Sequence, residues 1–235
     1  MASTSEIGHA KNIANLNLLN TNIVALGSIY NPSNPKLEIN NLQSIYTTAF
    51  DQQNIVNSSV APYSIAVDNR ELIFKPLGKK ITKLRKAYKA TEGVTQAQLE
   101  DFMTVARKIK GIRKITSETN TEDYSVSQLS YDQRTNNMDL LISLLQNTPN
   151  YSPNEEEYKV TSYQLLKTEM LKATQKVADT FVPLNNARSL RNDTMYISEN
   201  NLVDIANKAK DYLYTILDSE SAQYKAISKI KFKKP

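Results

Sequence analysis

The sequence repeats itself at an offset of 121 residues, and this internal repeat restricts the possible folds more than any other feature of the chain. The turn Tyr30-Asn31-Pro32 corresponds to Tyr151-Ser152-Pro153, and the same offset continues through the residues that follow. The aligned pairs include Ile45 with Leu166, Val56 with Val177, Pro62 with Pro183, Ala66 with Ala187, Arg70 with Arg191 and Leu84 with Ile205. A chance match would not keep its register over so many apolar positions, so we predict two diverged copies of one unit.

Apolar residues within each copy recur every three or four positions, which is the spacing of a helix that buries one face. The longest series runs from Leu42 to Val67 in the first copy and from Tyr163 to Leu184 in the second. Shorter series predict one helix before and two helices after each long one. Gly is scarce, at 5 of 235 residues, which argues against a turn-rich sheet. We therefore predict an all-α fold, in which two copies of a long helical-hairpin unit form an elongated helical bundle with coiled-coil character.

Capping residues and prolines predict where the long helices begin and bend. Ser152, with Glu155 three residues later, has the arrangement of a capping box and predicts a helix start. Asn34 predicts the corresponding start in the first copy. Pro62 and Pro183 lie inside the long helices, where a proline removes one backbone hydrogen bond, so we expect a kink at each.

A polar stretch without apolar periodicity separates the two copies. It covers residues 116–127 and is rich in Thr, Ser and Glu, as expected of a linker. The predicted domains are therefore a first helical repeat over residues 1–115 and a second over residues 128–235.

The Tyr-Asn-Pro turn, the Ala-x-x-x-Arg pair at Ala66 and Arg70, and the repeated order of helices resemble a group of uncharacterised tandem-repeat helical-bundle proteins of Gram-negative bacteria. The resemblance covers nearly the whole chain. It implies the helical fold, but it implies no activity, because that group has none assigned.

Residues needed for catalysis are scarce in this chain. It has no Cys, one His, no glycine-rich phosphate loop and no serine in a nucleophile-elbow context. The single histidine, His9, is expected to be a solvated surface residue rather than a base or a metal ligand. No carboxylate pair shows the Glu-x-x-His spacing by which helical bundles hold two metals. We therefore expect no enzyme activity, no cofactor and no metal site.

The net charge of +5 is modest, but the positive charges are concentrated in short runs. Lysines and arginines along one helix face can contact phosphates or an acidic partner. The competing interpretation is that these cations form the solvated side of helices whose other side is buried. Arg70 and Arg191 correspond across the copies, where a guanidinium would bind an anion, form a structural salt bridge or cover the helix seam with its stem. The candidate anion or partner contacts are Arg70, Arg191, Lys79, Lys80, Lys83, Lys86, Arg107, Lys108, Arg113 and Lys114.

A structural or self-assembling role is the function that these features favour. The chain would be the subunit of a filament, sheath or oligomer, with itself or another protein as partner. Two alternatives stay open: a pore-forming, toxin-like or membrane-acting helical protein, and a nucleic-acid-binding protein that uses basic helix faces. No stretch reaches the roughly 18 apolar residues of a membrane span. Since no leader is recognisable, we expect the cytoplasm by default, with leaderless export as the other route.

Overall fold

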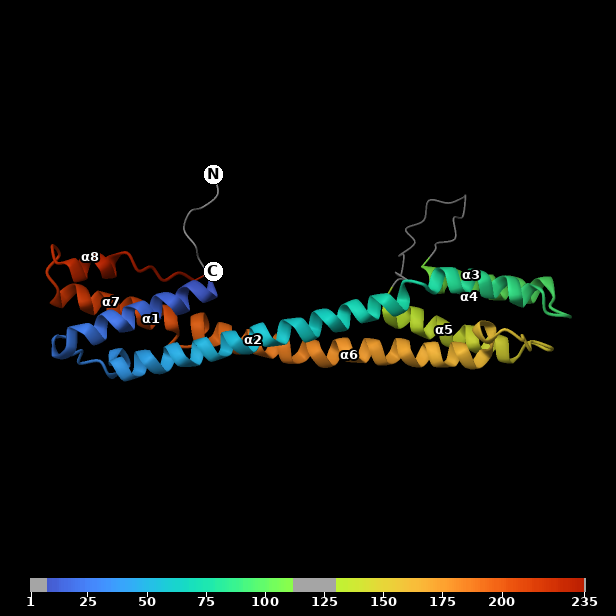
Figure 1. The fold of residues 1–235 in the computed structure, drawn as a ribbon, viewed down its shortest axis with the longest axis horizontal. Coiled ribbons are helices and arrows are strands. Elements are labelled where there is room, and N and C mark those ends of the chain that lie inside the picture. Colours follow the sequence, from blue (N-terminus) through green and yellow to red (C-terminus); the bar gives the residue numbers. More distant parts are fainter. Residues whose placement is uncertain (1–7, 112–129, 235) are drawn as a thin grey trace, which may run out of the picture. The chain divides into compact units, whose positions relative to one another are not determined.

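The computed structural model describes residues 8–111 and 130–234. These residues form eight α-helices joined by turns and short helices of other types, and no β-strand occurs in the two ranges (Figure 1). The all-α class predicted from the apolar periodicity is confirmed. The predicted linker 116–127 lies outside the described residues.

The chain folds into two compact units that do not coincide with the predicted domains 1–115 and 128–235. Unit 1 combines the residues up to Pro62 with those from Phe181 onwards, and unit 2 consists of the residues between them. Two long helices, α2 (Ile39–Phe74) and α6 (Val160–Asn192), each contribute residues to both units. The boundaries between the units fall at or near Pro62 and Pro183, yet both helices continue through their proline.

Unit 1 surrounds an apolar core supplied by α1, α2, α7 and the C-terminal segment. The chain returns along α1 after its last helix, and asparagines of α1 hold it there. Asn12 donates a hydrogen bond to the carbonyl of Lys233 at 2.8 Å, and Asn15 donates one to the carbonyl of Lys231 at 2.7 Å. Besides its parts of α2 and α6, the elements of unit 1 include α1 (His9–Leu26), η1 (Gly27–Ile29), η2 (Pro35–Leu37), η4 (Asp193–Ile197), α7 (Leu202–Ile216) and α8 (Ala222–Ser228).

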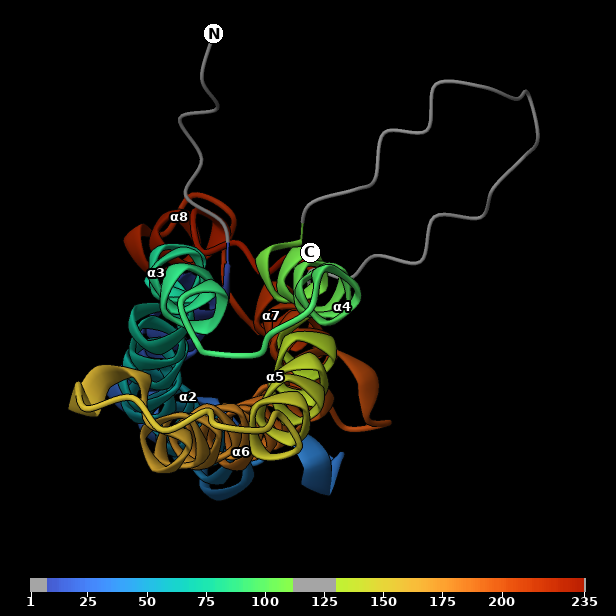
Figure 2. The ribbon, with the colours of Figure 1, turned by 90° about the vertical axis from the view of Figure 1, so that its right-hand side faces the viewer.

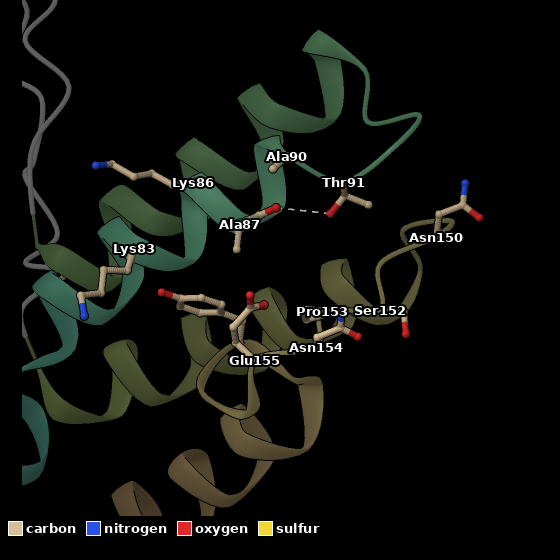
Figure 3. Close-up of a pocket in the computed structure, with 11 residues that line it drawn as sticks. Lys83, Lys86, Ala87, Ala90, Thr91, Asn150, Ser152, Pro153, Asn154 and Glu155 are labelled. Carbon is tan, nitrogen blue, oxygen red and sulfur yellow. Dashed lines mark hydrogen bonds between the residues drawn. The ribbon is translucent and has the colours of Figure 1, made fainter.

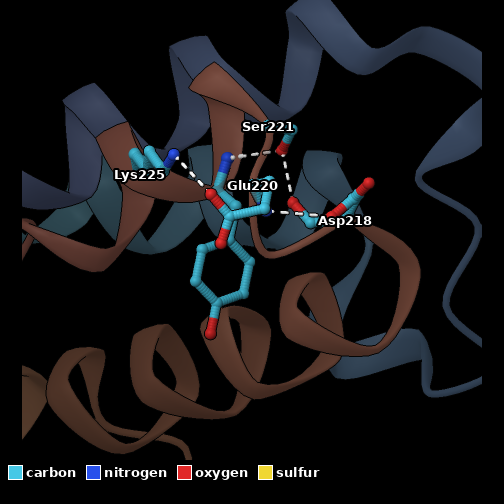
Figure 4. A network of polar contacts seen from close by, with 5 residues as sticks. Asp218, Glu220, Ser221 and Lys225 are labelled. Carbon is cyan, nitrogen blue, oxygen red and sulfur yellow. Dashed lines mark hydrogen bonds and ion pairs between the residues drawn. The ribbon is translucent and has the colours of Figure 1, made fainter.

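A cluster of polar contacts fixes the start of the short helix α8 (Figure 4). The Ser221 hydroxyl accepts a hydrogen bond from the backbone N–H of Tyr224 at 3.1 Å and donates one to the carbonyl of Asp218 at 2.6 Å. The ammonium of Lys225 pairs with the carboxylate of Glu220 at 2.9 Å. Such a serine cap satisfies a backbone donor that the helix leaves free and typically stabilises a helix by about 1 kcal/mol. The role of the cluster is therefore to stabilise the start of α8.

Unit 2 is built around α4, which packs against both α3 and α5 (Figure 2). The largest fully buried side chains of its core are Phe74, Tyr88 and Phe102. A capping box starts α4, because Thr95 and Gln98 exchange both hydrogen bonds of that motif. Besides its parts of α2 and α6, the elements of unit 2 are α3 (Leu77–Lys89), α4 (Gln96–Lys110), α5 (Tyr131–Gln146) and η3 (Glu156–Tyr158).

Two tyrosines, 121 residues apart, close the connections that lead into α2 and α6. The Tyr30 hydroxyl donates a hydrogen bond to the carbonyl of Leu37 at 2.7 Å. The Tyr151 hydroxyl donates one to the carbonyl of Tyr158 at 2.6 Å. Each acceptor is the last residue of a 3₁₀-helix, so each tyrosine ties the start of its connection to the end.

Both long α-helices start later than their capping signals predict. Asn34 does cap a helix, since its side chain accepts a hydrogen bond from the N–H of Lys36 at 3.0 Å, but that helix is the 3₁₀-helix η2. Ser152 caps no helix, because η3 begins only after Glu155. The next residue after each 3₁₀-helix is extended, with ψ 146° at Glu38 and 147° at Lys159. An extended residue breaks the helical path, so α2 and α6 begin beyond it.

Candidate functional site

Clusters that could hold a metal are absent from the described ranges, in which no three His, Asp or Glu side chains are grouped suitably. In the same ranges, no helix is both long enough and apolar enough to cross a membrane. The candidate contacts predicted from the sequence are all cations. Two of these cations, Arg113 and Lys114, lie outside the described residues.

Helices α3 and α4, here called the basic hairpin, carry six of the predicted contacts. Along α3, the buried side consists of Leu77, Ile81, Leu84 and Tyr88, which face the core of unit 2. The predicted contacts of the hairpin are Lys79, Lys80, Lys83, Lys86 and Lys108, which are all exposed, and Arg107, which is half-buried. The cations therefore occupy the solvent side of an amphipathic pair of helices.

A recess of about 540 Å³ on the basic hairpin, here called the basic recess, brings three cations together. It is lined by Arg85 of α3 and by Arg107 and Lys110 of α4. The sequence analysis selected Arg107 but neither of the other two. Arg85 and Lys110 lie in the same basic runs, and only the packing of α3 on α4 places them beside Arg107.

The cations of the basic recess are held by neutral partners. The Arg107 guanidinium donates to the Thr104 hydroxyl at 3.1 Å, and the Lys110 ammonium donates to the Thr82 hydroxyl at 2.7 Å. Burial lowers the pKa of Lys110, and the nearby Arg85 guanidinium lowers it further. One carboxylate, that of Glu100, also lines the recess and accepts a hydrogen bond from Gln96 at 3.0 Å. The recess therefore concentrates uncompensated positive charge.

A second recess of about 500 Å³ lies between the end of α3 and the connection that precedes η3 (Figure 3). Lys83 and Lys86 line it from α3, and Glu155 lines it from the other side. At its rim, the Thr91 hydroxyl donates to the carbonyl of Ala87 at 3.4 Å. With charges of both signs and no unpartnered buried group, this recess shows no preference for a particular ligand.

Arg70 and Arg191 are both half-buried, and each has its own set of neutral partners. The Arg70 guanidinium lies over the ring of Tyr131, 3.9 Å from its centroid, and its Nε is buried without a hydrogen bond. The Arg191 guanidinium donates to the Oδ1 of Asn192 at 2.9 Å and 3.2 Å, and more weakly to Gln53 at 3.5 Å. Arg70 belongs to unit 2 and Arg191 to unit 1.

His9 is not the solvated surface residue that the sequence analysis expects. Its Nε2 lies 3.2 Å from the Oδ1 of Asn192, and its ring packs edge-on against Tyr196 with centroids 5.4 Å apart. Burial lowers the pKa of His9, and the Arg191 guanidinium lowers it further, while the bond to Asn192 acts in the opposite direction. The expectation was wrong because Asn192, the last residue of α6, and Tyr196, in the π-helical turn after it, both contact the start of α1.

A groove of about 430 Å³ between α1 and α2 in unit 1, here called the Asn20 groove, has no counterpart among the predicted contacts. Asn20 lines it and is 4% exposed, yet neither its Oδ1 nor its Nδ2 has a hydrogen-bond partner. Val24 and Tyr46 also line the groove, and the Tyr46 ring stacks on Phe50 at 5.9 Å. Buried amides are almost always paired, so an unpaired one requires an explanation.

Comparisons with known proteins give no relative for this chain: no protein-family model, curated protein or solved structure matches it. The resemblance to tandem-repeat helical proteins of Gram-negative bacteria therefore stays a prediction. The function must be argued from the chain's own surfaces.

Proposed function

We propose that this chain is a non-enzymatic structural protein that associates with copies of itself, and that it consists of two diverged copies of one helical unit. Its self-association surface is the Asn20 groove, and the unpaired amide of Asn20 is the observation that carries the proposal. The partner is a second copy of the chain.

The pairs of residues that support the duplication lie 121 positions apart and have similar environments. The buried residues Leu42, Ala49 and Val56 of α2 correspond to the buried residues Tyr163, Met170 and Val177 of α6. The two tyrosine hydroxyl bonds, from Tyr30 and Tyr151, also correspond in donor and acceptor. Under this proposal, each unit contains the first part of one copy and the second part of the other. Neither copy then has a complete core of its own.

Apolar side chains of the kind that interfaces bury are exposed in and next to the Asn20 groove. Val24 lines the groove and is 57% exposed, and Phe50, whose ring stacks on the groove residue Tyr46, is 45% exposed. Single exposed apolar residues are common on monomeric proteins, but here they lie beside a groove. Val24 comes from α1 and Phe50 from α2, so a partner that covered the groove would contact both helices.

Asn20 explains why a second copy is a suitable partner. A buried amide without partners costs about 1–3 kcal/mol. Its Nδ2 is a donor and its Oδ1 an acceptor, so two such amides complement each other across a two-fold axis. Buried asparagines pair in this way in coiled coils, where they select the register and number of helices at a cost in stability. Self-association would thus satisfy a group that the isolated chain leaves unpaired.

The test compares the mass of the purified chain with that of two variants by light scattering and sedimentation equilibrium over a range of concentrations. We expect the parent chain to form dimers or larger assemblies. The double variant Val24→Ser with Phe50→Ser should weaken association by about tenfold or more, as expected when two apolar contacts are lost. The control is Ile197→Ser, which removes a side chain of unit 1 that is 72% exposed but does not line the groove.

Three outcomes contradict the proposal: a parent chain that stays a monomer of about 26.5 kDa at high concentration, equal weakening by the control, and no weakening by the double variant. Negative-stain electron microscopy of the same samples shows whether the associated form is a filament or a closed oligomer. Circular dichroism confirms that the variants keep the helical content of the parent.

A further inference from the structure

We propose that the basic hairpin of unit 2 binds the phosphate backbone of double-stranded nucleic acid without regard to base sequence. This surface is separate from the Asn20 groove, and the proposal does not depend on self-association. It rests on the charge of the hairpin, the absence of ion pairs on it and the chemistry of the basic recess.

The basic hairpin carries more positive charge than the whole chain. Residues 77–110 contain nine Lys and Arg against three Asp and Glu, an excess of six, whereas the full chain has a net charge of +5. The other described residues of unit 2 contain seven Lys and Arg against nine Asp and Glu. The charge is therefore a local property of α3, α4 and their connection, and it creates a positive field over that face.

Within the part of the chain that the structure describes, the cations of the basic hairpin form no ion pairs. Among the described residues, every ion pair joins side chains outside residues 77–110. Lysines on an ordinary solvated helix face are often matched by acidic residues one turn away. The described hairpin has three acidic residues, Glu92, Glu100 and Asp101, and none of them forms an ion pair with a cation of α3. The cations of α3 can therefore contact an external anion.

The basic recess has the chemistry of a phosphate site. Arg85 and Arg107 provide guanidinium groups, which match the paired oxygens of a phosphate, and Lys110 provides a point charge. Burial lowers the pKa of Lys110, and the neighbouring Arg85 guanidinium lowers it further, so these two cations repel each other. A phosphate placed among the three would relieve their mutual repulsion.

The apolar side chains of the hairpin favour a duplex backbone over other anionic partners. Tyr88 and Phe102 are fully buried and stack on each other with centroids 4.8 Å apart. They cannot stack on unpaired bases, which single-strand binders require. Leu77, Ile81 and Leu84 are also buried, so the hairpin lacks an apolar face with which to enter a lipid surface. What it presents is a set of cations that extends about 15 Å along α3, from Lys79 to Lys89, enough to contact several phosphates.

The test measures binding of the full chain to a fluorescent 24-base-pair DNA duplex by anisotropy, between 50 and 200 mM salt. The test variant carries Arg85→Gln, Arg107→Gln and Lys110→Gln. The matched control carries Lys208→Gln, Lys229→Gln and Lys231→Gln, which removes the same charge from exposed, unpaired lysines of unit 1. If three phosphate contacts are lost, the slope of log K against log salt should become shallower by about three, and affinity at 100 mM salt should fall by about 10- to 100-fold.

The control variant should lose less than about threefold in affinity, since its cations do not lie on the hairpin. A second variant, Lys83→Gln with Lys86→Gln, changes only exposed side chains and should also weaken binding, which protects the test against a folding defect in the first. The proposal is overturned if the parent chain does not bind the duplex at 50 mM salt, or if the test and control variants lose affinity equally. It is also overturned if the chain binds vesicles rich in phosphatidylserine, or a polyglutamate peptide, more tightly than the duplex.

Discussion

Unit 1 and unit 2 differ in what they expose, although their cores are built from corresponding helices under the proposed duplication. In the described residues, unit 1 exposes ten large apolar side chains and unit 2 exposes five. The charges show the opposite contrast. Helices α3 and α4 of unit 2 carry an excess of six positive charges, whereas residues 202–228, which include α7 and α8 of unit 1, contain three Lys and Arg against four Asp and Glu.

The contrast between the units shows that the buried face and the exposed face of a helix can diverge independently. The buried positions of α3 are apolar, and those of α7 are apolar apart from Lys210, because the core tolerates little else. The exposed positions are constrained much less by folding. One unit can therefore carry a self-association surface while the other carries a surface for an anionic partner.

Exchanging one buried residue between the units should change the free energy of unfolding more than any other substitution proposed for comparing them. Asn20 of unit 1 corresponds to Ile142 of unit 2 at an offset of 122, and both are buried. We expect Ile142→Asn to lower the free energy of unfolding by about 3–5 kcal/mol, since it removes apolar contacts and buries an amide. Asn20→Ile should raise it by about 1–3 kcal/mol, because an unpaired amide is removed.

Urea denaturation followed by circular dichroism at low protein concentration measures both changes. The control is Asn54→Ile, which makes the same substitution at an exposed position of α2 that does not line the groove, and it should change stability by less than about 0.5 kcal/mol. A loss of stability in Asn20→Ile would mean that the amide of Asn20 is satisfied inside the unit. In that case Asn20 would not mark an interface.

Removing the tyrosine hydroxyls tests whether the two connections are equivalent. Tyr30→Phe and Tyr151→Phe each delete one hydrogen bond to a backbone carbonyl, so each should lower the free energy of unfolding by about 1–2 kcal/mol. Similar losses would support the correspondence between the copies. A loss in only one of them would show that the two connections have different structural roles.

The same tyrosines predict a loss of stability in alkali. Burial raises the pKa of Tyr30 to about 12 and that of Tyr151 to about 12, with the neighbouring Tyr212 and Tyr88 as further causes. An unfolded tyrosine loses its proton near pH 10. Between pH 10 and pH 12 the folded chain therefore holds protons that the unfolded chain has released, so stability falls as pH rises. The fall should be less steep in each Phe variant than in the parent.

Apolar periodicity was sufficient to predict the helices, because burial of one face imposes it on the sequence. The first, third and fourth helices of each predicted copy lie near the positions that the periodicity indicates. The starts of α2 and α6 were not, since an extended residue between a 3₁₀-helix and an α-helix leaves no clear signal in a single sequence. The division into two units also escaped prediction, because it depends on which segments pack together and not on any local pattern.

The candidate sites were harder to predict than the helices. The basic runs identified the right helices, but Arg85 and Lys110 join Arg107 only through the packing of α3 on α4. Asn20 could have been noticed, because the predicted repeat aligns it with an isoleucine at a position where the helix should be apolar. Under the proposed function, a polar residue at an apolar position of the predicted repeat is a usable signal for an interface.

The smallest expected change in stability comes from the titration of His9. This residue corresponds to Tyr131 of unit 2 at an offset of 122. Because burial and Arg191 lower the pKa of His9, the unfolded chain binds a proton below about pH 6.5 that the folded chain does not yet bind. Stability should therefore fall as pH drops below about 6.5. His9→Tyr, which places the unit 2 residue in unit 1, should abolish that part of the pH dependence and leave the part due to carboxylates.

Proton NMR measures the underlying titration directly, since His9 is the only histidine in the sequence. Its ring protons should titrate with a pKa below 6.5 in the parent chain. In Arg191→Gln the pKa should move back toward 6.5, because the second cause of the shift is removed while burial remains. A pKa at or above 6.5 in the parent would mean that the ring is solvated. Unit 1 would then lack the aromatic contact at the start of α1 that Tyr131 makes with Phe74 in unit 2, where the ring centroids are 4.8 Å apart.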